Sequence, residues 1–138
     1  MGSREAALAA VSAMPYDLRN LAEEWKADRE VVMTAVAQCG AALQYAAEAM
    51  RNSREVVLAA VSQDAEALAW AGTELRNDHE VVLTAVAKNG KAFKHASEAM
   101  RSDREVVLAA VSREGRALQF AAEELKSDRE VVMTAVSS

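Results

Sequence analysis

The sequence predicts an all-α protein: an α-solenoid of about eleven short helices, arranged in 25-residue helix-turn-helix repeats. Composition is the first observation behind this prediction, because 31 of the 138 residues are alanine, while Pro occurs once and Gly five times. Alanine is the best helix former and is depleted in strands. The second observation is a regular internal repeat, and the third is the helical spacing of apolar residues within each repeat.

The repeat, which we call a module, recurs along the chain without a single slip in its spacing. Its clearest marker is a glutamate that opens the block Glu-Val-Val-Leu/Met-Ala/Thr-Ala-Val, which is complete in every copy after the first. This glutamate occurs as Glu5, Glu30, Glu55, Glu80, Glu105 and Glu130. A fixed period of about 20–50 residues is typical of stacked units. The sequence also has a weaker period of two modules. The position of Ala9, for example, holds alanine and threonine alternately in successive modules.

Each module is expected to contain two short helices. The first begins near a capping Asp or Ser such as Asp28 and ends near a glycine such as Gly40, for which we expect the left-handed conformation. The second runs over about ten residues, for example 41–50, and ends beside Lys or Arg in every copy. Helices this short are not stable alone. Stacking of modules must therefore bury the apolar face of each helix, which contains Val31 in the first helix and Leu43 in the second.

We expect one α-helical repeat domain over residues 1–138. Its units are an atypical N-terminal module at 1–27, four modules at 28–52, 53–77, 78–102 and 103–127, and a half module at 128–138. An atypical first unit fits the capping role of terminal repeats.

Charge and hydropathy narrow the function classes. The net charge of −5 argues against nucleic acid and anionic membrane surfaces as partners. No apolar run reaches the roughly 18 residues of a membrane span, so membrane insertion is not expected. Cys39 is the sole cysteine, which excludes a disulfide scaffold and fits a reducing compartment. A cytoplasmic location is therefore the default expectation.

Three motifs carry a family resemblance. They are Asp-Arg-Glu-Val-Val-Leu-Ala-Ala-Val at 103–111, Gly-Arg-Ala-Leu-Gln-Phe-Ala at 115–121 and Glu-Glu-Leu-Lys-Ser-Asp at 123–128. In these motifs the chain resembles a tandem 25-residue helical-hairpin repeat family classed as a domain of unknown function, which occurs in large repeat proteins of algae, other protists and bacteria. The similarity covers nearly the whole chain from about Arg29 onward. The resemblance implies stacked repeats and an interaction role, and it transfers no catalytic residues.

The residues give no sign of an enzyme. We expect no catalytic residue, no cofactor and no metal ligand, because metal-binding motifs and glycine-rich phosphate loops are absent from the sequence. His79 occupies a slot that holds arginine in other modules, so we interpret it as a surface variant. Repeated carboxylates on a ladder are also a poor basis for the single pocket that catalysis requires.

Charged residues divide into two groups. Most acids and ten of the sixteen bases flank the junctions between modules, where they are expected to form a mixed charge ladder of caps and solvated ion pairs. An alternative is an acidic edge that docks a basic partner. Five of the six remaining bases cluster around the inner turns of two adjacent modules: Lys88, Lys91, Lys94, Arg113 and Arg116. This cluster either binds an anion or acidic peptide, or is a chance grouping of surface residues.

One slot of the second helix is mostly aromatic, and it holds Tyr45, Trp70, His95 and Phe120. On a continuous α-helix this slot would point away from the core stripe. The stripe could line a groove that binds a peptide or helix, or each second helix could be buried on both sides.

From these residues we predict a non-enzymatic protein-interaction or scaffold module that binds a peptide, helix or protein. Its candidate surface is the aromatic slot together with the basic cluster. The alternative is a structural spacer or assembly subunit that associates end to end through uncapped terminal helices. The partner would then be a second copy of the chain, as a homo-oligomer, because the last repeat block keeps the apolar residues of internal copies.

Overall fold

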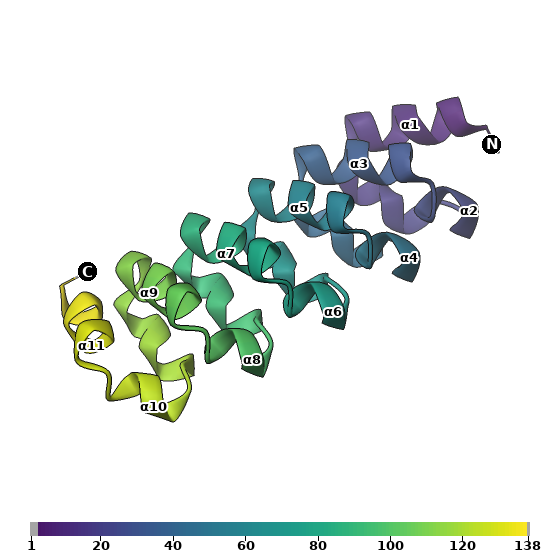
Figure 1. The fold of residues 1–138 in the computed structure, drawn as a ribbon. Helices are drawn as coiled ribbons and strands as arrows, with labels where there is room; N and C mark the ends of the chain where they lie inside the picture. Colours follow the sequence, from purple (N-terminus) through teal and green to yellow (C-terminus); the bar gives the residue numbers. More distant parts are fainter. Residues whose placement is uncertain (1–2, 138) are drawn as a thin grey trace.

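The computed structural model describes residues 3–137 of the chain. In this part every regular element is a helix, and the helices wind into an elongated solenoid whose two ends lie far apart (Figure 1). The all-α repeat fold predicted from the sequence is confirmed. Within the same residues, no helix is both long and apolar enough to cross a membrane.

Three kinds of helix recur from module to module. The long α-helices are α1 (Arg4–Ala13), α3 (Arg29–Gln38), α5 (Arg54–Gln63), α7 (His79–Lys88), α9 (Arg104–Arg113) and α11 (Arg129–Val136). The 3₁₀ helices are η1 (Pro15–Asn20), η2 (Gly40–Tyr45), η3 (Ala65–Trp70), η4 (Gly90–His95) and η5 (Gly115–Phe120). The one-turn α-helices are α2 (Glu23–Lys26), α4 (Glu48–Arg51), α6 (Thr73–Arg76), α8 (Glu98–Arg101) and α10 (Glu123–Lys126).

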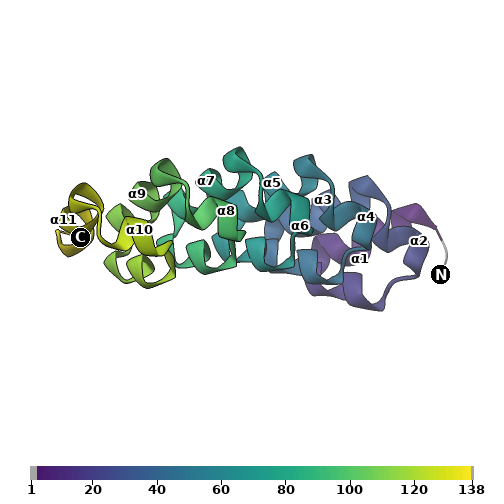
Figure 2. The same ribbon diagram turned by 60° about the horizontal axis from the view of Figure 1, so that its bottom comes forward.

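These helices form two layers. Consecutive long helices pack side by side in one layer, and consecutive 3₁₀ helices pack in the other. Each one-turn helix packs against the long helix that follows it, so the one-turn helices line one border of the solenoid (Figures 1 and 2). The core lies between the two layers and runs along the whole length.

The long helices follow the predicted pattern of caps and valines. The side chain of Asp28 accepts a hydrogen bond of 3.1 Å from the amide of Val31, as an N-cap residue does. Val31, Val32 and Val36 are fully buried, and their counterparts in α5, α7 and α9 are buried as well. Each of the four long helices α3, α5, α7 and α9 therefore buries a stripe of valines against its neighbours. A helix of this length would not be stable alone.

The second helix of each module is split, which corrects the prediction of one helix of about ten residues. In the second module η2 ends at Tyr45, and Ala46 and Ala47 are extended, with ψ of 154° and 155°. The amide of Ala47 donates a 3.0 Å hydrogen bond to the carbonyl of Lys26 in the preceding module. That bond takes the amide out of any continuous helix. The same bond recurs from Gly72 to Arg51, from Ser97 to Arg76 and from Ala122 to Arg101.

Glycine at the start of a 3₁₀ helix serves close packing, not the left-handed conformation that we expected. No glycine among residues 3–137 has a positive φ. A Cβ atom on Gly90 would lie 2.7 Å from the carbonyl oxygen of Ala110 in the next module. The turn at Gly90 therefore lies against the end of the neighbouring long helix.

Candidate functional site

The N-terminal ends of the long helices form one edge of the solenoid, which we call the ladder edge. Here the first residue of a long helix pairs with acids at the start of the next long helix. Nε of Arg4 lies 2.8 Å from Oδ2 of Asp28, and Nη2 of Arg104 lies 3.3 Å from Oδ1 of Asp128. The full set is Arg4 with Asp28 and Glu30, Arg29 with Glu55, Arg54 with Asp78 and Glu80, His79 with Asp103 and Glu105, and Arg104 with Asp128 and Glu130.

Carboxylates of the ladder edge serve two purposes at once. The hydrogen bond from Arg4 lowers the pKa of Asp28, and the amide of Val31 adds to this effect. The amide of Val131 lowers the pKa of Asp128, with Arg104 as the next contributor. Each of these aspartates therefore caps a helix and also joins two modules. Because the arginines are exposed, solvent screens the pairs and keeps their contribution to stability small.

The opposite edge, where each long helix turns into its 3₁₀ helix, is the turn edge. The predicted basic cluster lies here, and all five of its side chains are exposed: Lys88, Lys91, Lys94, Arg113 and Arg116. None of the five forms an ion pair within residues 3–137. Nε of Arg113 donates a hydrogen bond to the carbonyl of Ala87. The cations of the turn edge thus lack the partners that those of the ladder edge have.

Part of the basic cluster lines one hollow, which we call the turn-edge hollow. Lys91, Lys94, Arg116 and Phe120 line it, together with Glu114, and its volume is about 190 Å³. The other lining residues are Gly90, Ala117 and Gln119. The structure therefore brings together four of the nine predicted surface residues. Lys88 and Arg113 lie on the same edge but outside the lining of the hollow.

The aromatic slot is the last residue of each 3₁₀ helix, and it reaches back toward the preceding module. The ring of Tyr45 packs edge to face on Tyr16, with 5.9 Å between the ring centroids. Nε2 of His95 lies 3.1 Å from Oε1 of Glu66. In both pairs the partners are the same number of residues apart in the sequence. Each pair therefore joins the second residue of one 3₁₀ helix to the last residue of the next. The slot is therefore a contact between consecutive 3₁₀ helices.

Lys91 and Phe120 occupy the same two positions of consecutive 3₁₀ helices, and both line the turn-edge hollow. All four side chains of the slot are half-buried. Tyr45, Trp70 and Phe120 pack against the core while leaving part of the ring accessible. The angle predicted from a continuous α-helix does not apply, because the helix is a 3₁₀ helix that ends at this slot.

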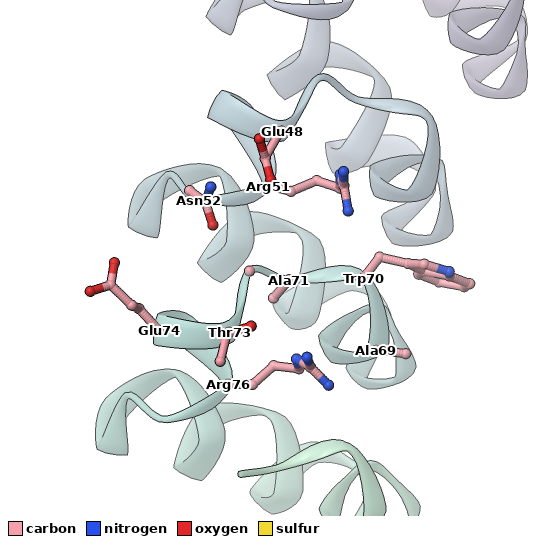
Figure 3. A pocket seen from close by; sticks show the side chains of 10 residues that line it. Glu48, Arg51, Asn52, Ala69, Trp70, Ala71, Thr73, Glu74 and Arg76 are labelled. Carbon is pink, nitrogen blue, oxygen red and sulfur yellow. The ribbon is translucent and has the colours of Figure 1, made fainter.

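Larger hollows lie at the junctions between one-turn helices. One, of about 430 Å³, is lined by Arg51, Trp70, Glu74 and Arg76 among others, and Figure 3 shows both arginines and Trp70 directed to the same side while Glu74 points the other way. Its counterpart two modules further on has a volume of about 560 Å³ and is lined by Arg101, Phe120 and Glu124 among others. Phe120 thus borders this hollow and the turn-edge hollow.

A model of the family described as Domain of unknown function (DUF4116) matches the chain three times in tandem, over residues 3–51, 53–101 and 103–138. The chain belongs to this family. Each of the first two matches spans two modules of this DUF4116 chain, in agreement with the weaker two-module period of the sequence. No curated protein and no solved structure matches the chain.

Sequence reasoning missed one feature of the DUF4116 repeat, the half-buried arginines at the ends of the one-turn helices. Nη1 of Arg101 donates a 3.4 Å hydrogen bond to the carbonyl of Phe120 in the next module. The Nε atoms of Arg76 and Arg101 are buried and have no hydrogen-bond partner among the described residues. The signal was present as a base after every second helix, but the sequence suggested only a helix-terminal charge.

Proposed function

We propose that this chain is a non-enzymatic interaction module whose turn-edge hollow binds an acidic segment of a partner protein. The observation that carries the proposal is the lining of this hollow. Lys91, Lys94 and Arg116 line it without an ion-pair partner among the described residues, beside a single acid, Glu114, and the half-buried ring of Phe120. Cations without partners favour a ligand that supplies carboxylates, and an exposed ring adds apolar contact area.

Chemistry of the surroundings favours a peptide over a nucleic acid. The chain carries a net charge of −5, which repels a polyanion at long range. The three cations are confined to η4 and η5, so they do not form the continuous basic track that a nucleic-acid backbone requires. A short acidic segment needs only such a local site.

The non-enzymatic part of the proposal is supported by the way the carboxylates are used. On the ladder edge, Asp28 and Asp128 cap helices and pair with arginines of the preceding module. Residues committed to repeated structural contacts are poor candidates for acid–base catalysis, which needs a distinct pocket with a distinct environment.

Binding of a fluorescein-labelled, Glu-rich peptide that contains one Leu tests this function, with fluorescence anisotropy as the readout. The matched probe is the same peptide with every Glu replaced by Gln. We expect saturable binding of the Glu peptide, weakened at least about tenfold by Arg116→Glu, since a favourable charge contact becomes a repulsive one. The Gln peptide should bind less well, and added salt should weaken the Glu peptide further.

Lys88→Glu is the matched control variant. It makes the same charge change on the same edge, but Lys88 does not line the hollow. We expect it to weaken binding less than Arg116→Glu does. Equal losses for the two variants, or equal binding of the Glu and Gln peptides, would contradict a specific acidic-peptide site.

A second candidate function is end-to-end assembly of copies of this chain. Met133 and Val136 at the end of α11 are 57% and 71% exposed, which is high for large apolar side chains. Arg129 has no ion pair within the described residues, and neither has Glu5. If a second copy continued the repeat, Glu5 of that copy would take the ladder position opposite Arg129. Charge at this ladder position therefore suits a stack of copies.

Light scattering after gel filtration tests this assembly over a range of protein concentrations. We expect the mass to rise with concentration and Arg129→Glu to reduce the rise, because the variant places two acids opposite each other. A mass that stays at that of one chain over the range would rule out this assembly.

A further inference from the structure

One position of the ladder edge differs from the others in a way that changes its chemistry. Between α7 and α9, the residue that contacts the acids of the next module is His79. At every other ladder pair among the described residues it is an arginine. A guanidinium can only donate hydrogen bonds, whereas a neutral imidazole presents a nitrogen lone pair that can bind a metal ion. His79 faces the same two carboxylates that an arginine faces elsewhere, those of Asp103 and Glu105.

The geometry of these three side chains suits a metal ion. Nε2 of His79 lies 3.5 Å from Oδ1 of Asp103 and 3.1 Å from Oε1 of Glu105. One ligand atom from each residue lies within 4.8 Å of the other two. Tetrahedral zinc with bonds of about 2.0–2.2 Å places neighbouring ligand atoms about 3.3–3.6 Å apart. The two separations from His79 therefore lie close to this range, and the two carboxylate oxygens lie within 4.8 Å of each other.

One of the three ligands, Asp103, is also held in place by the fold. Oδ1 of Asp103 accepts a 3.1 Å hydrogen bond from the amide of Val106, which orients the carboxylate at the start of α9. His79 is the first residue of α7, and Glu105 is the second residue of α9. The imidazole and the Asp103 side chain are 42% and 32% exposed, so they are accessible to an ion from solvent while part of each is packed.

We propose that His79, Asp103 and Glu105 form a zinc site that joins α7 to α9. The zinc ion would supply the positive charge that arginine supplies at the other ladder positions, and solvent would complete its coordination. A nitrogen ligand beside two carboxylates favours zinc over magnesium or calcium, which prefer oxygen ligands alone. No metal motif is visible in the sequence, because the three ligands come from two modules and meet only when those modules stack.

Isothermal titration calorimetry of the full chain with zinc chloride, in a buffer free of other metals, tests the site. Cys39 is a half-buried free thiol that could bind zinc on its own, so the chain with Cys39→Ser is the reference. We expect one zinc ion per chain in this reference. His79→Arg restores the common ladder residue and should abolish saturable binding. Asp103→Asn should weaken binding at least about tenfold while keeping a good N-cap residue.

His95→Ala is the control, because His95 lies beside Glu66 alone and not beside two carboxylates. It should leave zinc affinity unchanged. Thermal unfolding supplies a second readout, since a ligand that binds only the folded chain raises Tm. Zinc should raise the Tm of the reference chain but not that of His79→Arg. Absence of saturable binding in the reference chain, equal affinity in His79→Arg, or loss of binding in His95→Ala would each overturn the proposal.

Discussion

The ladder edge and the turn edge both carry exposed basic residues, but those of the ladder edge are paired with acids and those of the turn edge are not. At the ladder edge Arg4 and Arg54 contact acids of the next module at 2.8 and 3.1 Å. At the turn edge Lys91, Lys94 and Arg116 have no acidic partner within residues 3–137, although Glu114 lies in the same hollow. Charge in this solenoid is therefore structural where it is paired between modules, and the proposed ligand site lies where such pairs are absent.

Helix direction explains why the edges differ. All long helices begin at the ladder edge, where acids are favoured because they cap amides and complement the helix dipole. They end at the turn edge, where Lys88 and Arg113 occupy the last turn of their helices. The dipole favours cations there without supplying a discrete partner.

The largest expected effect concerns the core beneath the turn edge. Phe93 in η4 is fully buried, so Phe93→Ala should lower the free energy of unfolding by about 3–5 kcal/mol. Phe120→Ala should cost only about 1 kcal/mol, because its ring is half-buried. Urea denaturation measures both losses, and Phe93→Leu is the control because other modules hold leucine in that slot. Equal losses for the two alanine variants would place Phe120 in the core and remove it from the candidate surface.

Acid should weaken the ladder edge. The pKa values of Asp28 and Asp128 are lowered in the folded chain from the usual 3.8, so the unfolded chain binds protons more readily. Their stabilising effect is therefore present above about pH 4 and is lost as the pH falls through the lower folded values. We expect Tm to fall below about pH 4, and Asp28→Asn to show a smaller fall than the wild type. An unchanged fall in Asp28→Asn would mean that other carboxylates control acid unfolding.

A smaller effect is expected from one ladder pair at neutral pH. Arg54→Ala removes the contacts to Asp78 and Glu80, and solvent already screens them. The free energy of unfolding should therefore fall by less than about 1 kcal/mol, and the loss should shrink at high salt. Chemical denaturation at low and high salt measures it. A loss of several kcal/mol would show that the ladder provides much more stability than exposed pairs normally do.

The smallest effect on stability is expected at the turn edge. Lys94→Ala removes an exposed cation without an ion-pair partner in the described chain, so the free energy of unfolding should change by less than about 0.5 kcal/mol. The same variant should weaken binding of the Glu-rich peptide. A destabilised Lys94→Ala chain would show that this cation is structural, and the contrast between the two edges would fail.

The sequence predicted the features that depend on local spacing. The repeat period, the caps at Asp28 and its counterparts, and the buried valines such as Val31 follow from periodicity and cap chemistry alone. The split second helix did not, because the bond from Ala47 to Lys26 depends on a neighbouring module. The signal was the slot of Ala47, Gly72, Ser97 and Ala122, where only small residues occur.

Prediction of the candidate site was limited for the same reason. The cations of the turn edge were identified from sequence. The hollow, which Lys91 lines and Lys88 does not, arises from the packing of η4 on η5. The ladder pairs and the cluster around His79 join residues of consecutive modules. Such contacts are set by the rise and rotation between modules, which no short window of sequence contains.

The backbone bond between modules has a consequence for how this chain can change in length. It joins the same two slots at every junction where it occurs, from Ala47 to Lys26 and from Ala122 to Arg101. Duplication or deletion of a whole module would therefore leave this bond possible at each remaining junction. A solenoid joined in this way could be lengthened by whole units without a new kind of junction.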